Sequence, residues 1–328
     1  MTRAVFLSSG GDPFIASLVM KLWKERWYDE VDKFYIVYNN HASVPLDVAQ
    51  EFVTKAIADP KVHLIYHPRG IGNGMPITEM TLVSQEDLVM LLEDDGFIFA
   101  PGAVNEAFQR IEKDQCDAVG SPRGSCGQEV WDAAKEKYNL DYSGYGDVGP
   151  NYWPNFFFCK RKDLLKTDLN FASKAFPEGD YFKELDHIFK TVNYGDTFVW
   201  GCIQLRYLGV RFSSIPQYHA RPEEIDLAER YEEKWANGEN PRWIHGGSLS
   251  AGWGGYLSGH KPDVSELSSK MEIESRCAFW RIAAESTTGY DDFKIKYFKG
   301  IENLIEMSEL SRERIQTKYN LYKKLMQI

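Results

Sequence analysis

Three consecutive carboxylates, Glu93, Asp94 and Asp95, follow a continuous apolar run at residues 88–92. An unbroken apolar run is typical of a strand buried on both faces of a parallel sheet, and charges at its end require compensation. Ligands of open α/β sheets bind at the carboxyl ends of the strands, and hard divalent cations prefer oxygen ligands. The pattern therefore predicts a Mg²⁺ or Mn²⁺ site that holds a diphosphate. A solvated acidic turn is the alternative interpretation.

The elements that must position these acids are short strands alternating with helices. Strands are expected at residues 4–7, 34–38, 62–66 and 88–92, and apolar residues at helical spacing fill the intervals. This alternation predicts a mostly parallel central sheet flanked by helices, with right-handed crossovers. Residues 123–154 lose the pattern and are predicted to be a long loop. From residue 265 onward the spacing predicts a helical C-terminal extension that packs on the main domain or forms a homodimer contact.

Polar residues also end the neighbouring strands. Ser8 and Ser9 follow the first strand, Asn39 ends the second, and Arg69 lies in the loop after the third. Since the carboxyl ends of parallel strands meet at one edge of the sheet, these residues are expected near the acids. For Arg69, a plain surface position is the alternative interpretation.

The second half of the chain adds one carboxylate and two histidines. Asp196 precedes an expected helix at 197–208, where it is either functional or a plain N-cap. His219 follows the next strand, and His245 lies in a segment at 243–260 that is rich in Gly, Ser and aromatics. Either imidazole is a reasonable third ligand for Mn²⁺. The composition of 243–260 predicts a mobile lid, with a plain linker as the alternative.

Taken together, these features resemble GT-A fold glycosyltransferases over residues 3–220. The acidic-tipped strand resembles the D-x-D (DXD) motif of that family. The later segment resembles its acceptor-side pattern, with an acid at a helix start, a helix ending in L-R-x-x-G and a strand followed by a His. The chain departs from the family pattern at Glu93, where Asp is commoner, and at Gly195, where many members carry a second acid.

The resemblance implies a GT-A (Rossmann-like) catalytic domain at 1–260, with a nucleotide-sugar-binding half at 1–121 and an acceptor-binding half with the lid at 122–260. The helical extension then covers 261–328. The implied activity is metal-dependent transfer of a hexose from a nucleoside-diphosphate sugar, with UDP favoured, to a saccharide or other hydroxyl acceptor. The implied nucleotide-sugar contacts are Ser8, Ser9, Asn39, Arg69, Glu93 and Asp94; the implied ligands of Mn²⁺ or Mg²⁺ are Glu93, Asp95, His219 and His245; and Asp196 is the general base of an inverting transfer.

Composition and charge argue against several other classes of function. A net charge of −10 argues against a nucleic-acid surface, which needs a basic patch. The five scattered cysteines form no C-x-x-C pair, which argues against a disulfide framework or zinc site and favours a reducing, cytoplasmic setting. No apolar stretch approaches the length of a membrane span. Two rivals remain: a sugar-phosphate nucleotidyltransferase, whose basic Gly-rich loop is missing after the first strand, and a non-catalytic carbohydrate-binding protein on the same fold.

Overall fold

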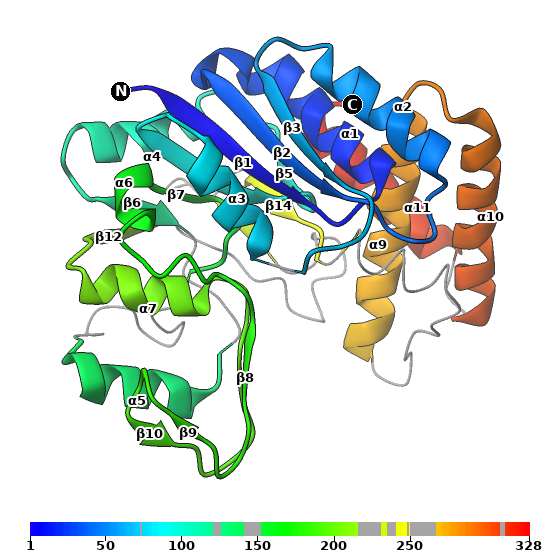
Figure 1. Ribbon diagram of the computed structural model, residues 1–328. Coiled ribbons are helices and arrows are strands. Elements are labelled where there is room, and N and C mark those ends of the chain that lie inside the picture. The colour runs from blue at the N-terminus through cyan, green and yellow to red at the C-terminus, as the bar shows by residue number, and fades with distance from the viewer. Residues whose placement is uncertain are drawn as a thin grey trace.

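The computed structural model describes residues 1–72, 74–120, 126–140, 152–215, 231–234, 241–247, 249, 267–308 and 312–328. A seven-stranded sheet with the order β12-β6-β7-β4-β1-β2-β3 forms its centre (Figure 1). The strands are β1 (Arg3–Ser9), β2 (Lys33–Asn39), β3 (Val62–His67), β4 (Leu88–Glu93), β6 (Ala118–Gly120), β7 (Phe157–Lys160) and β12 (Phe212–Ser214). β7 runs antiparallel to β4 and β6, and the other neighbours are parallel. The predicted α/β class with a mostly parallel sheet is confirmed.

The burial of β4 explains its unbroken apolar sequence. Leu88, Met90 and Leu92 belong to the large hydrophobic cluster on one face of the sheet, and Val89 and Leu91 belong to the cluster on the other face. None of the five is more than 1% exposed. Because successive side chains of a strand point to opposite faces, a strand covered on both sides needs an apolar residue at every position. Glu93 is the first residue at which this burial ends.

Helices cover both faces of the sheet. The large cluster lies under α1 (Pro13–Leu22), α2 (Leu46–Ile57) and α4 (Ala103–Glu112), and the second cluster lies under α3 (Met75–Val83), α6 (Arg161–Leu164) and α7 (Val199–Tyr207). A π-helical turn (Trp23–Trp27) and a 3-10 turn (Tyr28–Glu30) join α1 to β2. Among the helices described, none combines the length and apolar character needed to cross a membrane.

The C-terminal helices are α9 (Leu267–Ser286), α10 (Asp291–Met307) and α11 (Arg312–Met326). They belong to the same large cluster as α1, and α9 packs directly on α1. Phe14 of α1 lies in ring contact with Tyr290, Phe293 and Tyr297. The extension therefore shares one core with the main sheet.

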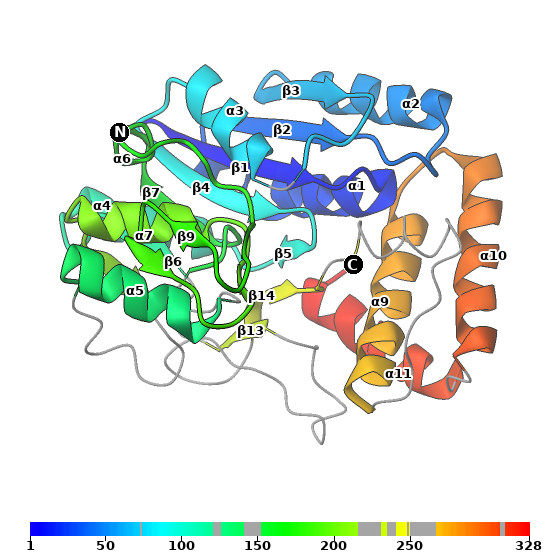
Figure 2. The same ribbon diagram turned by 60° about the horizontal axis from the view of Figure 1, so that its bottom comes forward.

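A small lobe lies on the opposite side of the molecule from the C-terminal helices (Figures 1 and 2). It consists of α5 (Gln128–Tyr138), β8 (Lys174–Phe176), β9 (Tyr181–Phe182), β10 (His187–Ile188) and β11 (Asn193–Gly195). Its own hydrophobic cluster shares α7 with the main domain, since Val199, Trp200 and Ile203 face the lobe. The long loop predicted at 123–154 is corrected here, because α5 forms within it and buries Val130 and Trp131.

A three-stranded antiparallel sheet lies next to the acidic strand. It has the order β13-β14-β5, with β5 at Gly96–Ile98, β13 at Tyr231–Lys234 and β14 at Pro241–His245. Only two residues, Asp94 and Asp95, separate the end of β4 at Glu93 from the start of β5, so the acidic triplet lies at the tight connection between the two sheets. Figure 2 shows β14 alongside β5.

Candidate functional site

The carboxyl ends of β1, β2 and β4 open onto a cavity of about 180 Å³. Its wall contains most of the residues expected from the sequence: Ser8, Ser9, Asn39, Glu93, Asp94, Asp95, Asp196 and His245. Arg69 is exposed in the loop after β3 and is absent from this wall. His219 lies outside the described residues, as does most of the segment predicted to be a lid.

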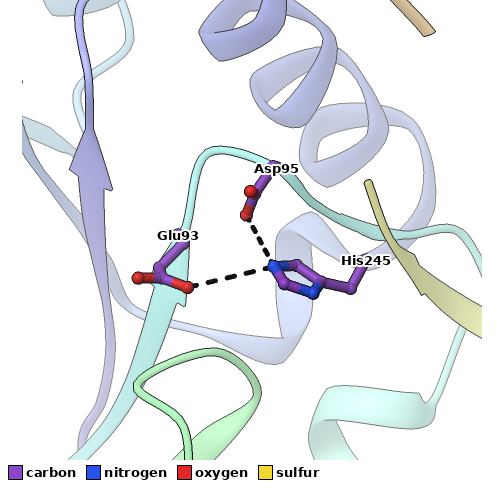
Figure 3. Close-up of side chains that lie close together, drawn as sticks. All are labelled: Glu93, Asp95 and His245. Carbon is purple, nitrogen blue, oxygen red and sulfur yellow. Dashed lines mark ion pairs between the residues drawn. The ribbon is translucent and has the colours of Figure 1, made fainter. Parts of the chain in front are cut away.

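Glu93, Asp95 and His245 form a potential metal centre within this cavity (Figure 3). Nε2 of His245 lies 3.1 Å from Oδ1 of Asp95 and 4.0 Å from Oε2 of Glu93. The three ligand atoms all lie within 4.8 Å of one another. Two carboxylate oxygens and one imidazole nitrogen are a donor set that suits Mn²⁺ and is also compatible with Mg²⁺.

Strand register brings His245 to the acids. β14 pairs with β5 so that His245 stands opposite Gly96, and the backbone N–H of Gly246 donates to the carbonyl of Asp95 over 2.8 Å. The residue is 5% exposed, and its ring makes a T-shaped contact with the Trp153 ring, with ring centroids 4.9 Å apart. Of the two histidines proposed from the sequence, His245 therefore lies beside the acidic triplet.

Burial and the neighbouring acids both raise the pKa of Glu93. Burial is the main cause, followed by the negative charges of Asp95 and Asp196, and together they place that pKa well above its usual range. Although part of the Glu93 side chain is open to the cavity (34% exposed), its carboxylate is surrounded by other acids. A bound cation would relieve this repulsion, so the residues present fit a divalent metal.

Asp94, the middle acid, faces the loop after β1 instead. Its Oδ2 accepts hydrogen bonds from Ser9 Oγ at 2.9 Å and from the Gly10 N–H at 2.8 Å. The Asp94 N–H also donates to the carbonyl of Ser8 at 3.1 Å. Asp94 and Ser9 thereby fix the β1 loop to the tip of β4, and direct contact of either with a nucleotide sugar remains a prediction.

The end of β2 closes another part of the cavity wall. Asn39 lines the cavity, and its Oδ1 is buried with no hydrogen-bond partner among the described residues. The neighbouring β1 loop approaches closely because Gly11 has a φ of +93°, and a Cβ there would lie 2.1 Å from the carbonyl oxygen of Asn39. A side chain at position 11 would therefore push the two strand ends apart.

Asp196 belongs to the turn that leads into α7. The helix begins at Val199, after Phe198, which has a φ of +72° and no side-chain cap. The N-cap interpretation of Asp196 is therefore wrong, as is the expected helix start at Thr197. Asp196 Oδ1 accepts the Thr197 N–H at 2.8 Å. Burial raises the pKa of Asp196, while the Thr197 N–H and the nearby His245 act in the opposite direction.

The sequence pattern does not predict Trp153, Pro154 and Asn155 as residues of the site. The first two line the cavity, and Asn155, 2% exposed, contacts Glu93 and Asp95 of the acidic triplet. These residues lie immediately before β7, whose antiparallel pairing with β4 carries them to the acids. The sequence carries one local signal here, the aromatic run Phe156–Phe158 that enters β7, and this run does not single out the polar residue before it.

No family model matches this chain, and no curated protein matches it. Among solved structures, mannosyltransferase PcManGT from Pyrobaculum calidifontis in complex with GDP-Man and Mn²⁺ is 11% identical with a TM-score of 0.43, covering 99% of this chain and 85% of that one. S. aureus TarS 1–349 is 10% identical with a TM-score of 0.41, covering 99% and 81%. TarS 1–349 in complex with UDP-GlcNAc is 12% identical with a TM-score of 0.40, covering 100% and 81%. At these values the matches identify neither donor nor acceptor of this chain.

Proposed function

We propose that this chain is a divalent-metal-dependent glycosyltransferase. It moves a sugar from a nucleoside diphosphate, with UDP favoured by the sequence resemblance, to a hydroxyl acceptor. One observation carries the proposal: Glu93, Asp95 and His245 converge within 4.8 Å in a cavity that also contains the polar strand ends and Asp196. A cluster of acids alone would suggest only a cation site. This cavity also contains polar groups suited to a nucleotide, together with the buried carboxylate of Asp196.

The donor nucleotide is proposed to lie along the ends of β1 and β2. Asn39 Oδ1, which has no partner among the described residues, accepts an N–H of the base. The backbone of Ser8, Ser9 and Gly10 approaches the ribose, with Asp94 holding that loop in place. The diphosphate would then lie near Glu93, Asp95 and His245, the residues that would hold the metal.

A divalent cation bound by these three residues would supply positive charge to the departing diphosphate. The protein contributes the ligand positions: β4 fixes Glu93, the β4–β5 turn fixes Asp95, and pairing of β14 with β5 fixes His245. Such preorganisation is effective because the ligands need no rearrangement during the reaction.

Asp196 is proposed to activate the acceptor. The acceptor hydroxyl oxygen attacks the anomeric carbon as the bond from that carbon to the diphosphate oxygen breaks, and the hydroxyl proton passes to the Asp196 carboxylate. Burial raises the pKa of Asp196, which makes the carboxylate a better proton acceptor. Attack from the face opposite the leaving diphosphate inverts the anomeric configuration.

The test is release of nucleoside diphosphate from a panel of UDP- and GDP-sugars with Mn²⁺, with and without EDTA. A glycosyltransferase releases the diphosphate in the presence of an acceptor and loses this activity with EDTA. Pyrophosphate formation from a nucleoside triphosphate and a sugar 1-phosphate would identify a nucleotidyltransferase. Donor binding without turnover, across a panel of saccharide acceptors, would identify a carbohydrate-binding protein.

A further inference from the structure

A short segment before β7, Trp153–Phe156, contacts every part of the potential metal centre; we call it the WPNF segment. The Trp153 ring makes a T-shaped contact with the ring of His245. Asn155 Oδ1 accepts the backbone N–H of Glu93 at 3.3 Å, and its Nδ2 donates to Asp95 Oδ1 at 3.5 Å. Phe156 packs on Trp243 of β14, two residues before His245, with ring centroids 3.6 Å apart.

The orientation of the Asn155 amide follows from its partners. The Glu93 N–H can only donate, so the amide atom facing it must be the oxygen. The amide nitrogen then faces the Asp95 carboxylate, which can accept its hydrogen bond. A neutral amide thus supplies a donor to Asp95 without adding another negative charge to a cavity that already holds four carboxylates, those of Glu93, Asp94, Asp95 and Asp196.

Two backbone features allow this close approach. Phe156 has a φ of +57°, a left-handed conformation that is unfavourable for a non-glycine residue and persists where surrounding structure requires it. Opposite Asn155, a Cβ on Gly96 would lie 2.3 Å from Asn155 Oδ1. Glycine at 96 and the turn at 156 therefore bring the amide to the tip of β4.

We infer that Asn155 is a positioning residue of the metal centre, which fixes the Asp95 carboxylate and the Glu93 backbone in the geometry that binds the cation. This inference rests on the proposed function, since it requires the cation site. Groups that hydrogen-bond to metal ligands orient them and raise affinity, and their loss typically lowers metal affinity about 10- to 100-fold.

The chain offers a matched control in the small lobe. Asn193 is also a buried asparagine, its Nδ2 donates to the Glu129 carboxylate at 2.9 Å, and a Cβ on Gly127 would lie 2.1 Å from its Oδ1. The two asparagines thus share burial, a carboxylate partner and an apposed glycine. Only Asn155 contacts a proposed metal ligand.

The experiment is titration of the full chain with Mn²⁺, followed by the electron paramagnetic resonance signal of free Mn²⁺, alongside melting temperatures. Asn155→Ala is expected to weaken Mn²⁺ binding about 10- to 100-fold. Asn193→Ala is expected to lower the melting temperature and to keep the Mn²⁺ affinity of the wild type. Asn155→Ser, a milder truncation too short to reach both partners, is expected to act in the same direction and serves if the alanine variant does not fold.

Equal Mn²⁺ affinity of wild type and a folded Asn155 variant would overturn the positioning role alone. Equal weakening by Asn155→Ala and Asn193→Ala would also overturn it, because the effect would then follow from lost stability. A wild-type chain that binds no Mn²⁺, or whose binding survives Asp95→Ala, would overturn the proposed metal centre itself. The two proposals therefore fail in distinguishable ways.

Discussion

Two groupings of carboxylate and histidine in this molecule use the same residue types and have opposite electrostatics. In the cavity, Glu93 and Asp95 meet His245, and burial with neighbouring acids raises the pKa of Glu93. In the small lobe, Glu129 pairs with His187 at 2.9 Å and also accepts the Lys190 N–H. These donors, His187 first, lower the pKa of Glu129 to about 2.

The difference lies in how many donors each carboxylate has. Glu129 is surrounded by hydrogen-bond donors within the chain, so its charge is compensated and it serves to tie α5 to the β10–β11 connection. Glu93 faces other carboxylates, so its negative charge is favourable only when something external compensates it. Crowded acids with a histidine indicate a ligand site, whereas a donor-saturated acid indicates a structural link.

The largest expected effect is a loss of turnover on removal of a cavity carboxylate, with no such loss on removal of Glu129 in the small lobe. Asp95→Ala removes a proposed metal ligand and is expected to lower turnover by about three orders of magnitude or more, because the charge stabilisation of the leaving diphosphate is lost. UDP affinity should also lose its dependence on Mn²⁺. The control is Glu129→Ala, which should keep turnover near wild type. UDP affinity of the wild type that is unchanged by EDTA would contradict the assignment.

The next largest effect on turnover is expected at Asp196, another carboxylate of the cavity. Asp196→Asn keeps the side-chain size and the ability to accept the Thr197 N–H, but it cannot take up a proton. Turnover is expected to fall by roughly two to four orders of magnitude, with UDP affinity and melting temperature unchanged. A product that retains the donor's anomeric configuration, or near-normal turnover, would show that Asp196 is not the base.

A smaller effect, on the free energy of unfolding, is expected at Asp12, which accepts hydrogen bonds and is nevertheless buried. It caps α1 and accepts a hydrogen bond from the Tyr297 hydroxyl at 2.5 Å, yet burial raises its pKa from 3.8 to about 6. The folded state therefore favours the protonated acid. The stability that the Asp12 carboxyl group contributes to the folded protein is complete below pH 3.8 and is lost as the pH rises through about 6. The free energy of unfolding changes by up to about 3 kcal/mol over this range.

Asp12→Asn mimics the neutral acid and removes this dependence. Urea unfolding of both proteins between pH 4 and pH 8 should show the free energy of unfolding of the variant gaining on the wild type as the pH rises, with the gain complete above about pH 7. Parallel curves across this range would rule out the raised pKa.

The smallest effect is expected at the donor-saturated acid. Because the pKa of Glu129 is lowered from 4.5 to about 2, its contribution to stability is present above pH 4.5 and is lost as the pH falls through about 2. Glu129→Gln should lower the melting temperature at neutral pH, and the gap should close towards pH 2. A gap that stays constant from pH 7 to pH 2 would contradict the assigned pKa.

Much of the sheet and half of the cavity could be predicted from local sequence. Apolar runs mark β1, β2, β3 and β4, and the polar residues at their ends meet because parallel strands end at one edge. The position of His245 beside the acids could not be predicted, since it depends on the pairing of β14 with β5, which sets His245 opposite Gly96 from a distant part of the chain. Long-range register leaves no local signal.

Asn155 and Asp196 show the other limits of local patterns. Asn155 acts through the backbone of Glu93, and its amide is unremarkable until β7 pairs with β4. The helix after Asp196 begins two residues later than expected because Phe198 adopts a left-handed conformation that the local sequence does not predict. In both cases a non-glycine residue with positive φ, Phe156 or Phe198, lies beside the site, and tertiary packing imposes it.

The hydrogen bond between Asp12 and Tyr297 also has a consequence for synthesis of the chain. The two residues are 285 positions apart, so a ribosome adding about 5–20 residues per second completes the pair roughly 15–60 s after Asp12 is made. During that interval the loop after β1 lacks its buried partner, and Phe14 lacks the rings of α10. The loop after β1, although encoded first, therefore reaches its final contacts only once α10 has been made, and a nascent chain that stops before α10 leaves the Phe14 ring without these partners.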